Sequence, residues 1–276
     1  MERKINYALV VSDFDGTLVK SDGTVSDFSK QIINEYIRNG GIFAISTGRM
    51  PAGILPRAKE LGLTGFVCCA QGSAIVDIQT NEVILQGTIP NAVAINVCEK
   101  MEEMGLHIHV YDLWDYYSNM DDDALKMYES IVKTKAQLVL DKPISKFLQE
   151  TGLNPFKILA MVAPEDNEKI RVELEKENFE GCNVTRSSVF LVEVGNAAYS
   201  KGTAVRFLAD KYKVPMEKTI GIGDQINDLP MIETAALGLA VKNADEGLKA
   251  HATVLEYTHE EDAVARAILR YGYTQE

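Results

Sequence analysis

The sequence lacks the features that mark zinc-binding, membrane and nucleic-acid-binding proteins. It has four cysteines, none in a Cys-x-x-Cys pair or another zinc-like spacing, so a cysteine-based metal site is not expected. It has no signal-type start and no apolar run near the roughly 20 residues that cross a bilayer. It also lacks a basic excess, because 28 lysines and arginines face 40 acidic residues for a net charge of −12. We therefore expect a reduced, cytoplasmic protein that binds neither nucleic acid nor membrane.

The remaining composition is that of an ordinary soluble protein, with 46% hydrophobic and 25% charged residues over 276 positions. This length suits one or two domains with a full hydrophobic core. No coiled-coil pattern or swapped strand is apparent, so we expect a monomer. The negative net charge does not exclude an anionic substrate, because a metal ion or a lysine can reverse the field inside a cleft.

Strands and helices alternate at both ends of the chain. The first 80 residues predict strands at 7–11, 42–46 and 66–70 and helices at 26–39 and 54–61, with Ser26 as a candidate N-cap. The last 75 residues predict helices at 202–212, 229–236 and 261–269 and strands at 219–222 and 238–241. The first two strands are continuously apolar, as expected for a parallel sheet that helices cover on both faces.

The middle of the chain follows a different pattern. Residues 106–111 alternate apolar and polar side chains, and this period of two indicates a sheet with one polar face. Further strands are predicted at 114–118, 156–162, 183–187 and 190–194, and helices at 92–104 and 165–178. We therefore predict an α/β fold with a parallel sheet in a discontinuous core domain, residues 1–83 and 194–276, and an inserted α+β domain, residues 84–193.

Four polar motifs stand at the ends of predicted strands or at a helix start. They are Asp13-Phe14-Asp15-Gly16-Thr17-Leu18, Ser46-Thr47-Gly48-Arg49, Lys201-Gly202 and Gly223-Asp224-Gln225-Ile226-Asn227-Asp228. Each motif alone is compatible with an ordinary turn or helix cap. If the strands are parallel neighbours, however, all four motifs meet at one edge of the sheet, where open α/β folds bind ligands.

These side chains suit phosphoryl transfer. Mg²⁺ takes oxygen ligands, and Asp13 and Asp224 offer carboxylates while Asp15 offers a backbone carbonyl. Donors for phosphate oxygens come from three groups, the Thr47 hydroxyl, the Gly48 amide and the Lys201 ammonium. Asp13 is the candidate covalent nucleophile. Asp15 is placed to protonate the leaving oxygen and then to deprotonate water.

As a set, the motifs resemble those of the haloacid dehalogenase superfamily of phosphohydrolases: D-x-D-x-T, a Ser/Thr after the second strand, a Lys, and G-D-x-x-N-D. Their order, with an insertion before Lys201, resembles the Cof-like sugar-phosphatase branch with a C2-type α/β cap. The resemblance covers essentially the whole chain. It implies a Rossmann-like core, a mobile cap, Mg²⁺ as the cofactor and an aspartyl-phosphate intermediate on Asp13.

The resemblance also implies residue roles. Asp15 matches the acid/base, Thr47, Gly48 and Lys201 the phosphate binders, and Asp13, Asp15 and Asp224 the metal ligands. Asn227 and Asp228 match residues that position Lys201 and the metal surroundings. Arg49 is interpreted as a surface or supporting arginine and is not counted among the catalytic residues.

Three short stretches depart from the family pattern. Gln71-Gly72-Ser73 stands for the usual Asn-Gly-Ala, Val241-Lys242-Asn243-Ala244 for Met-Gly-Asn-Ala, and Ala263 for a glycine in Glu261-Asp262-Ala263-Val264. None of these changes touches a reacting group. They therefore bear on loop shape and substrate preference rather than on the chemistry.

In the inserted domain, alternation places His107, His109 and Tyr111 together on one strand face. Two interpretations stay open: this face contacts the leaving group, or it is an exposed face without a role. Arg186 is a second candidate for contact with an anionic leaving group. Substrate preference is expected to depend on such inserted residues, which the four motifs do not cover.

The leading hypothesis is a Mg²⁺-dependent phosphatase of small phosphorylated metabolites, with sugar phosphates as the first expectation. One alternative is a phosphomutase or phosphotransferase that passes the phosphoryl group to a sugar hydroxyl. Another is a catalytically retired regulator that binds a phosphorylated metabolite.

Overall fold

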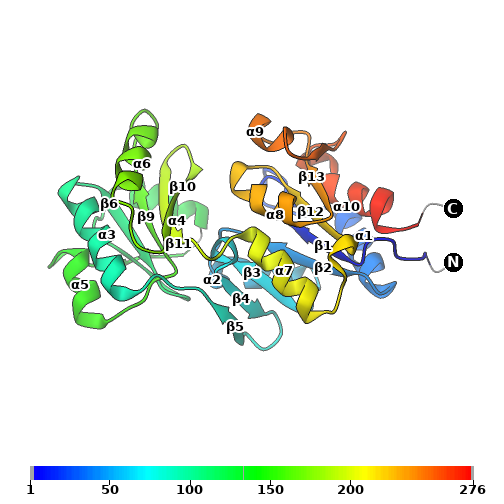
Figure 1. Cartoon of the computed structure of the whole chain (residues 1–276), viewed down its shortest axis with the longest axis horizontal. Helices are drawn as coiled ribbons and strands as arrows, with labels where there is room; N and C mark the ends of the chain where they lie inside the picture. The colour runs from blue at the N-terminus through cyan, green and yellow to red at the C-terminus, as the bar shows by residue number, and fades with distance from the viewer. Residues whose placement is uncertain (1–2, 133, 275–276) are drawn as a thin grey trace. The chain divides into compact units, whose positions relative to one another are not determined.

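The structure, a computed structural model, describes residues 3–132 and 134–274. The chain forms two compact units. The core unit holds the residues up to Arg49, then Ile54–Ile84, then the chain from Tyr199 onward. The cap unit holds Met50–Gly53 and Leu85–Ala198. In the core unit, the first (blue) and last (orange to red) parts of the chain lie together (Figure 1).

The core unit is built on an eight-stranded sheet. In spatial order its strands are β14 (Thr253–Val254), β13 (Leu237–Ala240), β12 (Thr219–Gly223), β1 (Leu9–Ser12), β2 (Ile42–Ser46), β3 (Phe66–Cys69), β4 (Ala74–Asp77) and β5 (Val83–Gln86). The pairings from β14 to β3 are parallel, and β4 then runs antiparallel to β3. The expectation that the motif-bearing strands are parallel neighbours is met, because β12, β1 and β2 are adjacent.

The helices of the core unit are α1 (Asp27–Arg38), α2 (Pro51–Glu60), α7 (Lys201–Lys211), α8 (Leu229–Thr234), α9 (Glu246–Lys249) and α10 (Ala263–Ala267). All but one of the five predicted helices begin and end close to their predicted positions, and the short α9 was not predicted. The predicted N-cap of α1 is confirmed, since the Ser26 hydroxyl accepts a hydrogen bond from Ser29 N at 3.0 Å.

The exception is the last helix, predicted as one piece from 261 to 269. The structure has a short 3-10 turn, His259–Glu261, before α10 and a π-helical turn, Ile268–Gly272, after it. Asp262 between the first two has a left-handed backbone with φ of 62°. Its carboxylate accepts the hydroxyls of Ser26 and Ser29, so a tie to the start of α1 interrupts the helix.

The cap unit contains a six-stranded sheet with helices on its faces. The strand order is β10 (Cys182–Ser188), β11 (Leu191–Asn196), β9 (Lys157–Met161), β6 (His107–Tyr111), β7 (Tyr116–Ser118) and β8 (Gln137–Leu138). The helices are α3 (Asn91–Glu103), α4 (Asp123–Val132), α5 (Ile144–Thr151) and α6 (Asn167–Lys176). Because β11 continues to Asn196, the predicted boundary at 193/194 falls inside a strand, and the chain returns to the core unit only after Ala198.

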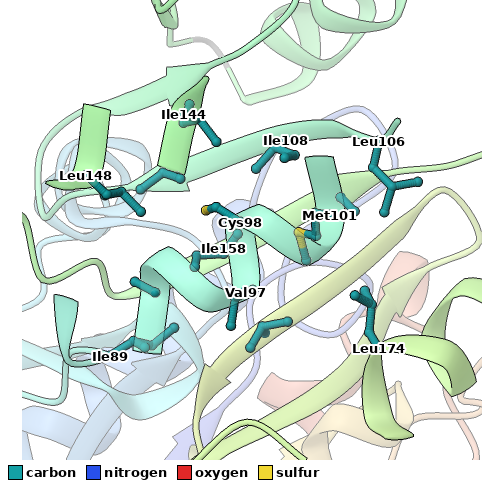
Figure 2. Packing of buried hydrophobic residues seen from close by; sticks show 14 of the residues in the cluster. Ile89, Val97, Cys98, Met101, Leu106, Ile108, Ile144, Leu148, Ile158 and Leu174 are labelled. Atoms are coloured by element: carbon teal, nitrogen blue, oxygen red, sulfur yellow. The ribbon is translucent and has the colours of Figure 1, made fainter. Parts of the chain in front are cut away.

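One face of this sheet carries the main apolar core of the cap unit. Met101 of α3 and Leu148 of α5 pack with Ile108 of β6 and Ile158 of β9 (Figure 2). All four side chains are fully buried, and Ile108 comes from an apolar position of the predicted alternation. The apolar side of β6 therefore faces the core, as the alternation predicted.

The other face of the sheet is also covered. Leu125 and Tyr128 of α4 pack against Tyr111 and Leu159, and all five residues of β6 are buried. The polar face of β6 is therefore not open to solvent, because α4, which the sequence did not predict, lies on it. Among the described residues, no helix is long and apolar enough to cross a membrane.

Candidate active site

The central strand β1 delivers Asp13 to the edge of the core sheet. Its four residues are fully buried, and Ser12 lies opposite Ile222 of β12 and Ile45 of β2. Asp13 follows directly, and its N–H donates to the Ile222 carbonyl at 2.8 Å. Its side chain sits at the carboxyl end of a parallel sheet, where the ends of β12 and β2 are also found.

A tight turn after β1 brings Asp224 beside this edge. Gly16 has a left-handed φ of +74°, and a Cβ there would lie 2.5 Å from Asp224 Oδ2. A side chain at this position would therefore be strained in the backbone and would collide with the carboxylate. The Thr17 hydroxyl donates to Asp224 Oδ1 at 2.9 Å, so the D-x-D-x-T turn and the G-D-x-x-N-D loop hold each other.

Lys201 reaches the same point from the first turn of α7. Ser200 caps this helix by accepting a hydrogen bond from Thr203 N, within a capping box. The Lys201 side chain is 1% exposed, and its Nζ donates to Asp13 Oδ1 and Asp228 Oδ1, each at 2.5 Å. The ammonium is thereby held between two buried carboxylates.

Asp228 is fully buried and fixes the loop after β12. Its Oδ2 accepts the N–H groups of Asp224 at 2.8 Å and Gln225 at 3.0 Å, while its Oδ1 accepts Lys201. Asn227 beside it turns to a different partner, and its side-chain amide donates to Gln71 Oε1 at 3.2 Å. Of the two residues expected to support Lys201, Asp228 therefore bonds to it directly, whereas Asn227 bonds to Gln71.

The three carboxylates of Asp13, Asp224 and Asp228 form a buried cluster. One oxygen from each lies within 4.8 Å of the others, and no other such group of three His, Cys, Asp or Glu residues occurs in the part of the chain that the structure describes. With Lys201 between them, the formal charge is −2. An all-oxygen donor set of this charge fits a hard divalent cation such as Mg²⁺.

The proton affinities of these groups reflect their burial. Burial raises the pKa of Asp13 well above its ordinary value, against the opposing charge of Lys201 and with the nearby Asp228 and Asp224 charges adding to the rise. The pKa of Asp224 is raised for the same first reason, burial, and by Asp228. For Lys201, burial favours the neutral amine, but the Asp13 and Asp228 charges outweigh it and raise the pKa. The cluster therefore carries more negative charge than its surroundings stabilise.

Asp15, two residues after Asp13, lies outside this cluster. Its carboxylate is 51% exposed and accepts two hydrogen bonds from Arg49, Nε to Oδ2 and Nη2 to Oδ1, both at 2.7 Å. This is the bidentate geometry for which a guanidinium is suited. The side chain of Asp15 is not placed among the metal-type ligands; the expected ligand from this residue, its backbone carbonyl, stays a prediction.

The end of β2 contributes Thr47 and Gly48. Thr47 is buried, and its N–H donates to the Cys68 carbonyl at 2.9 Å. A Cβ on Gly48 would lie 2.6 Å from Gln71 Nε2, so the absence of a side chain lets Gln71 approach the loop. Gln71 is one of the residues that depart from the family pattern, and here it links this loop to Asn227.

Comparison with known proteins matches this geometry to a family. A family model described as haloacid dehalogenase-like hydrolase matches residues 10–268. The chain belongs to this family. This hydrolase is 31% identical over 260 residues to a putative phosphatase of Haemophilus influenzae, and the match covers 94% of this chain and 96% of the relative. It is also 26% identical over 265 residues to a 5-amino-6-(5-phospho-D-ribitylamino)uracil phosphatase of Bacillus subtilis, covering 96% of this chain and 95% of that one.

Solved structures agree with the family. A haloacid dehalogenase-like hydrolase from Bacteroides thetaiotaomicron matches with a TM-score of 0.84 and 28% identity, covering 96% of this chain and 99% of that chain. A subclass IIB sugar phosphatase of the same superfamily has a TM-score of 0.80 at 20% identity, which shows a shared fold. The chain is therefore a phosphatase-type hydrolase with the Rossmann-like α/β core of this family.

The sequence-based interpretation of Arg49 as a surface or supporting arginine agrees with its pair with Asp15, although the sequence did not name that partner. Arg49 directly follows Thr47-Gly48, so it leaves the carboxyl end of β2 on the same edge as Asp15, which was the available signal. Asn243 was noted only as part of an unusual stretch, yet its Nδ2 donates to the Gly16 carbonyl at 2.9 Å. It thereby supports the turn that carries the acidic pair.

The residues predicted in the cap lie in the cap unit, mostly in its interior. His107 Nε2 is 2.9 Å from Ser118 Oγ and 3.1 Å from His109 Nε2, and Tyr111 OH donates to Tyr128 OH at 2.6 Å. The interpretation as an exposed face is wrong, because α4 covers these side chains. Arg186, by contrast, is exposed on β10. A role in substrate preference stays a prediction for all four residues, His107, His109, Tyr111 and Arg186.

Proposed function

We propose that this hydrolase is a Mg²⁺-dependent phosphatase of small phosphorylated metabolites, with sugar phosphates as the first class to test. The observation that carries the proposal is the buried cluster of Asp13, Asp224 and Asp228 around Lys201. Its formal charge of −2 is unfavourable in a buried site unless a cation offsets it. A divalent cation supplies the missing charge, and a phosphate monoester supplies the anion that such a cation and Lys201 bind together.

The metal would be held by the carboxylates of Asp13 and Asp224, with the Asp15 carbonyl as a further oxygen. When bound, it supplies positive charge that neutralises the carboxylates and binds phosphate oxygens. Asp228 holds the Asp224 loop through two backbone N–H groups and anchors Lys201. Lys201, the Thr47 hydroxyl and the Gly48 amide are assigned to phosphate binding.

The reaction is assigned to Asp13 and Asp15. An oxygen of Asp13 attacks phosphorus, a bond from oxygen to phosphorus forms, and the bond to the leaving oxygen breaks. Asp15 gives its proton to that leaving oxygen. Water then attacks the phosphoryl group on Asp13 while Asp15 takes the proton from water, which releases phosphate and restores both carboxyl groups.

The pair between Arg49 and Asp15 fits one half of this cycle. A guanidinium pairs with both oxygens of a carboxylate, so the pair as seen suits the step in which Asp15 receives a proton from water. For the first step Asp15 gives a proton to the leaving oxygen, and its side chain must then face that oxygen as well as Arg49. We assign Arg49 as the residue that positions Asp15 between these two states.

The test is phosphate release with and without Mg²⁺. Purified protein should hydrolyse p-nitrophenyl phosphate and members of a phosphorylated metabolite panel in Mg²⁺, and EDTA should abolish the activity. The Asp13→Asn variant should lose at least about 10³-fold in turnover, the scale on which removing a nucleophile costs an enzyme. Asp210→Asn, an exposed carboxyl on α7, is the matched control and should keep full activity.

Three outcomes decide between the candidates. Undiminished activity in Asp13→Asn would refute the nucleophile assignment. Appearance of an isomeric sugar phosphate in place of free phosphate would identify a phosphomutase. A folded protein that binds Mg²⁺ but releases no phosphate from any panel member would instead favour the retired regulator.

A further inference from the structure

A hollow opens in the core unit, with Asp15 among the residues that line it. It has a volume of about 310 Å³, and Asp15 and Arg49 form part of its wall together with Lys20, Arg57 and His259. All these residues belong to the core unit. The size is near the lower end of ordinary ligand pockets, enough for one charged arm of a small metabolite.

The hollow is basic although the protein is acidic. Lys20, Arg49 and Arg57 contribute three fixed positive charges and His259 an imidazole, against the single carboxylate of Asp15 on the wall. Such a concentration of positive charge differs from the net charge of −12 of the whole chain. In a concave site, charges of one sign reinforce one another and attract the opposite charge.

The Arg49 charge is offset by its pair with Asp15, so Lys20 and Arg57 are the positive charges that a ligand in the hollow would meet. Arg57 Nη1 donates to Glu60 Oε2 at 3.1 Å in an exposed pair one turn along α2, and such pairs are weak. Glu260 lies 3.4 Å from His259 Nε2. Lys20 has no ion pair or side-chain hydrogen bond within residues 3–132 and 134–274, although the Asp22 and Glu260 charges are near it.

The walls are held in place by backbone contacts. Lys20 N donates to the Thr24 carbonyl and Gly23 N to the Lys20 carbonyl, both at 2.9 Å, which closes the loop that carries Lys20. The loop is tied to the 3-10 turn of His259 because Ser21 N donates to Glu260 Oε1 at 2.8 Å. A site whose walls are fixed before binding loses less entropy when a ligand arrives.

We propose that this hollow binds a second anionic group of the substrate, a phosphate or a carboxylate, attached through the leaving group. The inference rests on the proposed function, in which Asp15 protonates the leaving oxygen, so an arm in a hollow walled by Asp15 belongs to the leaving alcohol. Arg57 offers the planar fork that pairs with carboxylate or phosphate, and Lys20 offers a point charge. The preferred substrates are therefore phosphate monoesters that carry another anion.

The experiment compares three six-carbon substrates in Mg²⁺: glucose 6-phosphate, 6-phosphogluconate and glucose 1,6-bisphosphate. We expect kcat/KM to be at least about 10-fold higher for a substrate with the second anion, because one charge-assisted hydrogen bond is worth this factor. The 6-phosphogluconate and bisphosphate arms tell whether a carboxylate or a phosphate is preferred. The measured quantity is a ratio: kcat/KM for the better of 6-phosphogluconate and glucose 1,6-bisphosphate, divided by kcat/KM for glucose 6-phosphate. This ratio should fall by about 10-fold in Arg57→Gln and in Lys20→Gln.

Lys59→Gln removes the same charge from the same helix, from an exposed side chain that donates to Asn81 outside the hollow, and should leave that ratio unchanged. A wild-type ratio near one, or a ratio that neither Arg57→Gln nor Lys20→Gln lowers, would overturn the inference while p-nitrophenyl phosphate hydrolysis upholds the proposed function. If no phosphate ester is hydrolysed at all, the proposed function fails and this inference fails with it.

Discussion

Replacing Lys201 by methionine tests whether the buried carboxylates depend on this single ammonium. Methionine keeps most of the apolar stem inside the core unit, and the change removes only the charge and its hydrogen bonds. In the wild type, Nζ donates to Asp13 and Asp228 from a side chain that is 1% exposed. In the variant, Asp13 and Asp228 lose this partner, and three carboxylates lie within 4.8 Å of one another without an ammonium between them.

The expected loss of stability follows from this geometry. Breaking a buried ion pair by removing one partner costs about 3–5 kcal/mol, because the remaining charge is left buried and uncompensated. Two carboxylates lose their partner here, but burial also raises the pKa values of Asp13 and Asp224, so proton uptake limits the penalty. At about 2–4 °C per kcal/mol for a domain of this size, the melting midpoint of the core unit should fall by roughly 6–20 °C.

The assay is a thermal melt in EDTA at neutral pH, followed by circular dichroism, beside phosphatase turnover in Mg²⁺. Lys218→Met is the control, since Lys218 is exposed just before β12 and has no side-chain ion pair among the described residues; its midpoint should move by less than about 2 °C. A similarly small shift in Lys201→Met would show that the cluster does not need the ammonium. That result would refute the charge argument even if turnover were lost.

Two further predictions concern the metal and the cap unit. Mg²⁺ at about 100 times its Kd should stabilise the protein by about 2.7 kcal/mol, a gain that Asp224→Asn should largely remove; a wild-type melt indifferent to Mg²⁺ would count against a metal site. Burial lowers the pKa of His109 to about 3, so between pH 6.5 and 3 the unfolded chain takes a proton that the folded cap unit does not. The free energy of unfolding of the cap unit should therefore fall by about 2 kcal/mol from pH 7 to pH 5. Denaturant melts should show a smaller fall over this pH range in His109→Gln, and an unchanged fall in the control His251→Gln, which replaces an exposed histidine.

The sequence predicts the core unit well because its strands carry an unambiguous pattern. Continuous apolar runs bounded by turn residues indicated β1 and β2, and the polar residues directly after them were expected at one sheet edge. That edge is real because the strands are parallel neighbours, with Ser12 of β1 opposite Ile222 and Ile45. Local pattern and long-range pairing agree here, so each supports the other.

The cap unit was predicted less completely for a reason visible in α4. Its apolar residues Leu125, Tyr128 and Val132 recur at helical spacing, so the amphipathic pattern of a helix is present in the sequence although it was not predicted. Alternation within β6 carries no information about an element elsewhere in the chain that covers its polar side. The exposed-face interpretation of β6 therefore stayed open until the structure placed α4 on that side.

The pair between Arg49 and Asp15 was beyond sequence reasoning for a different reason. It joins the ends of two strands through side-chain conformations that no spacing rule specifies. Adjacent strands alone bring many charged residues near one another, and only bond geometry of 2.7 Å at both oxygens distinguishes a bidentate pair from proximity. Strand order thus gives the neighbourhood of a site, while the choice of partners depends on rotamers.

The separate environments of Asp13 and Asp15 follow from where β1 ends. Two residues apart in a continuing strand, their side chains would share one face and one environment. The strand stops at Ser12, however, and Gly16 turns the chain in a left-handed conformation. Asp13 therefore stays in the buried cluster with Lys201, while Asp15 reaches solvent and Arg49. A single turn thus gives two carboxyls only two residues apart opposite environments, one desolvated beside an ammonium and the other accessible beside a guanidinium.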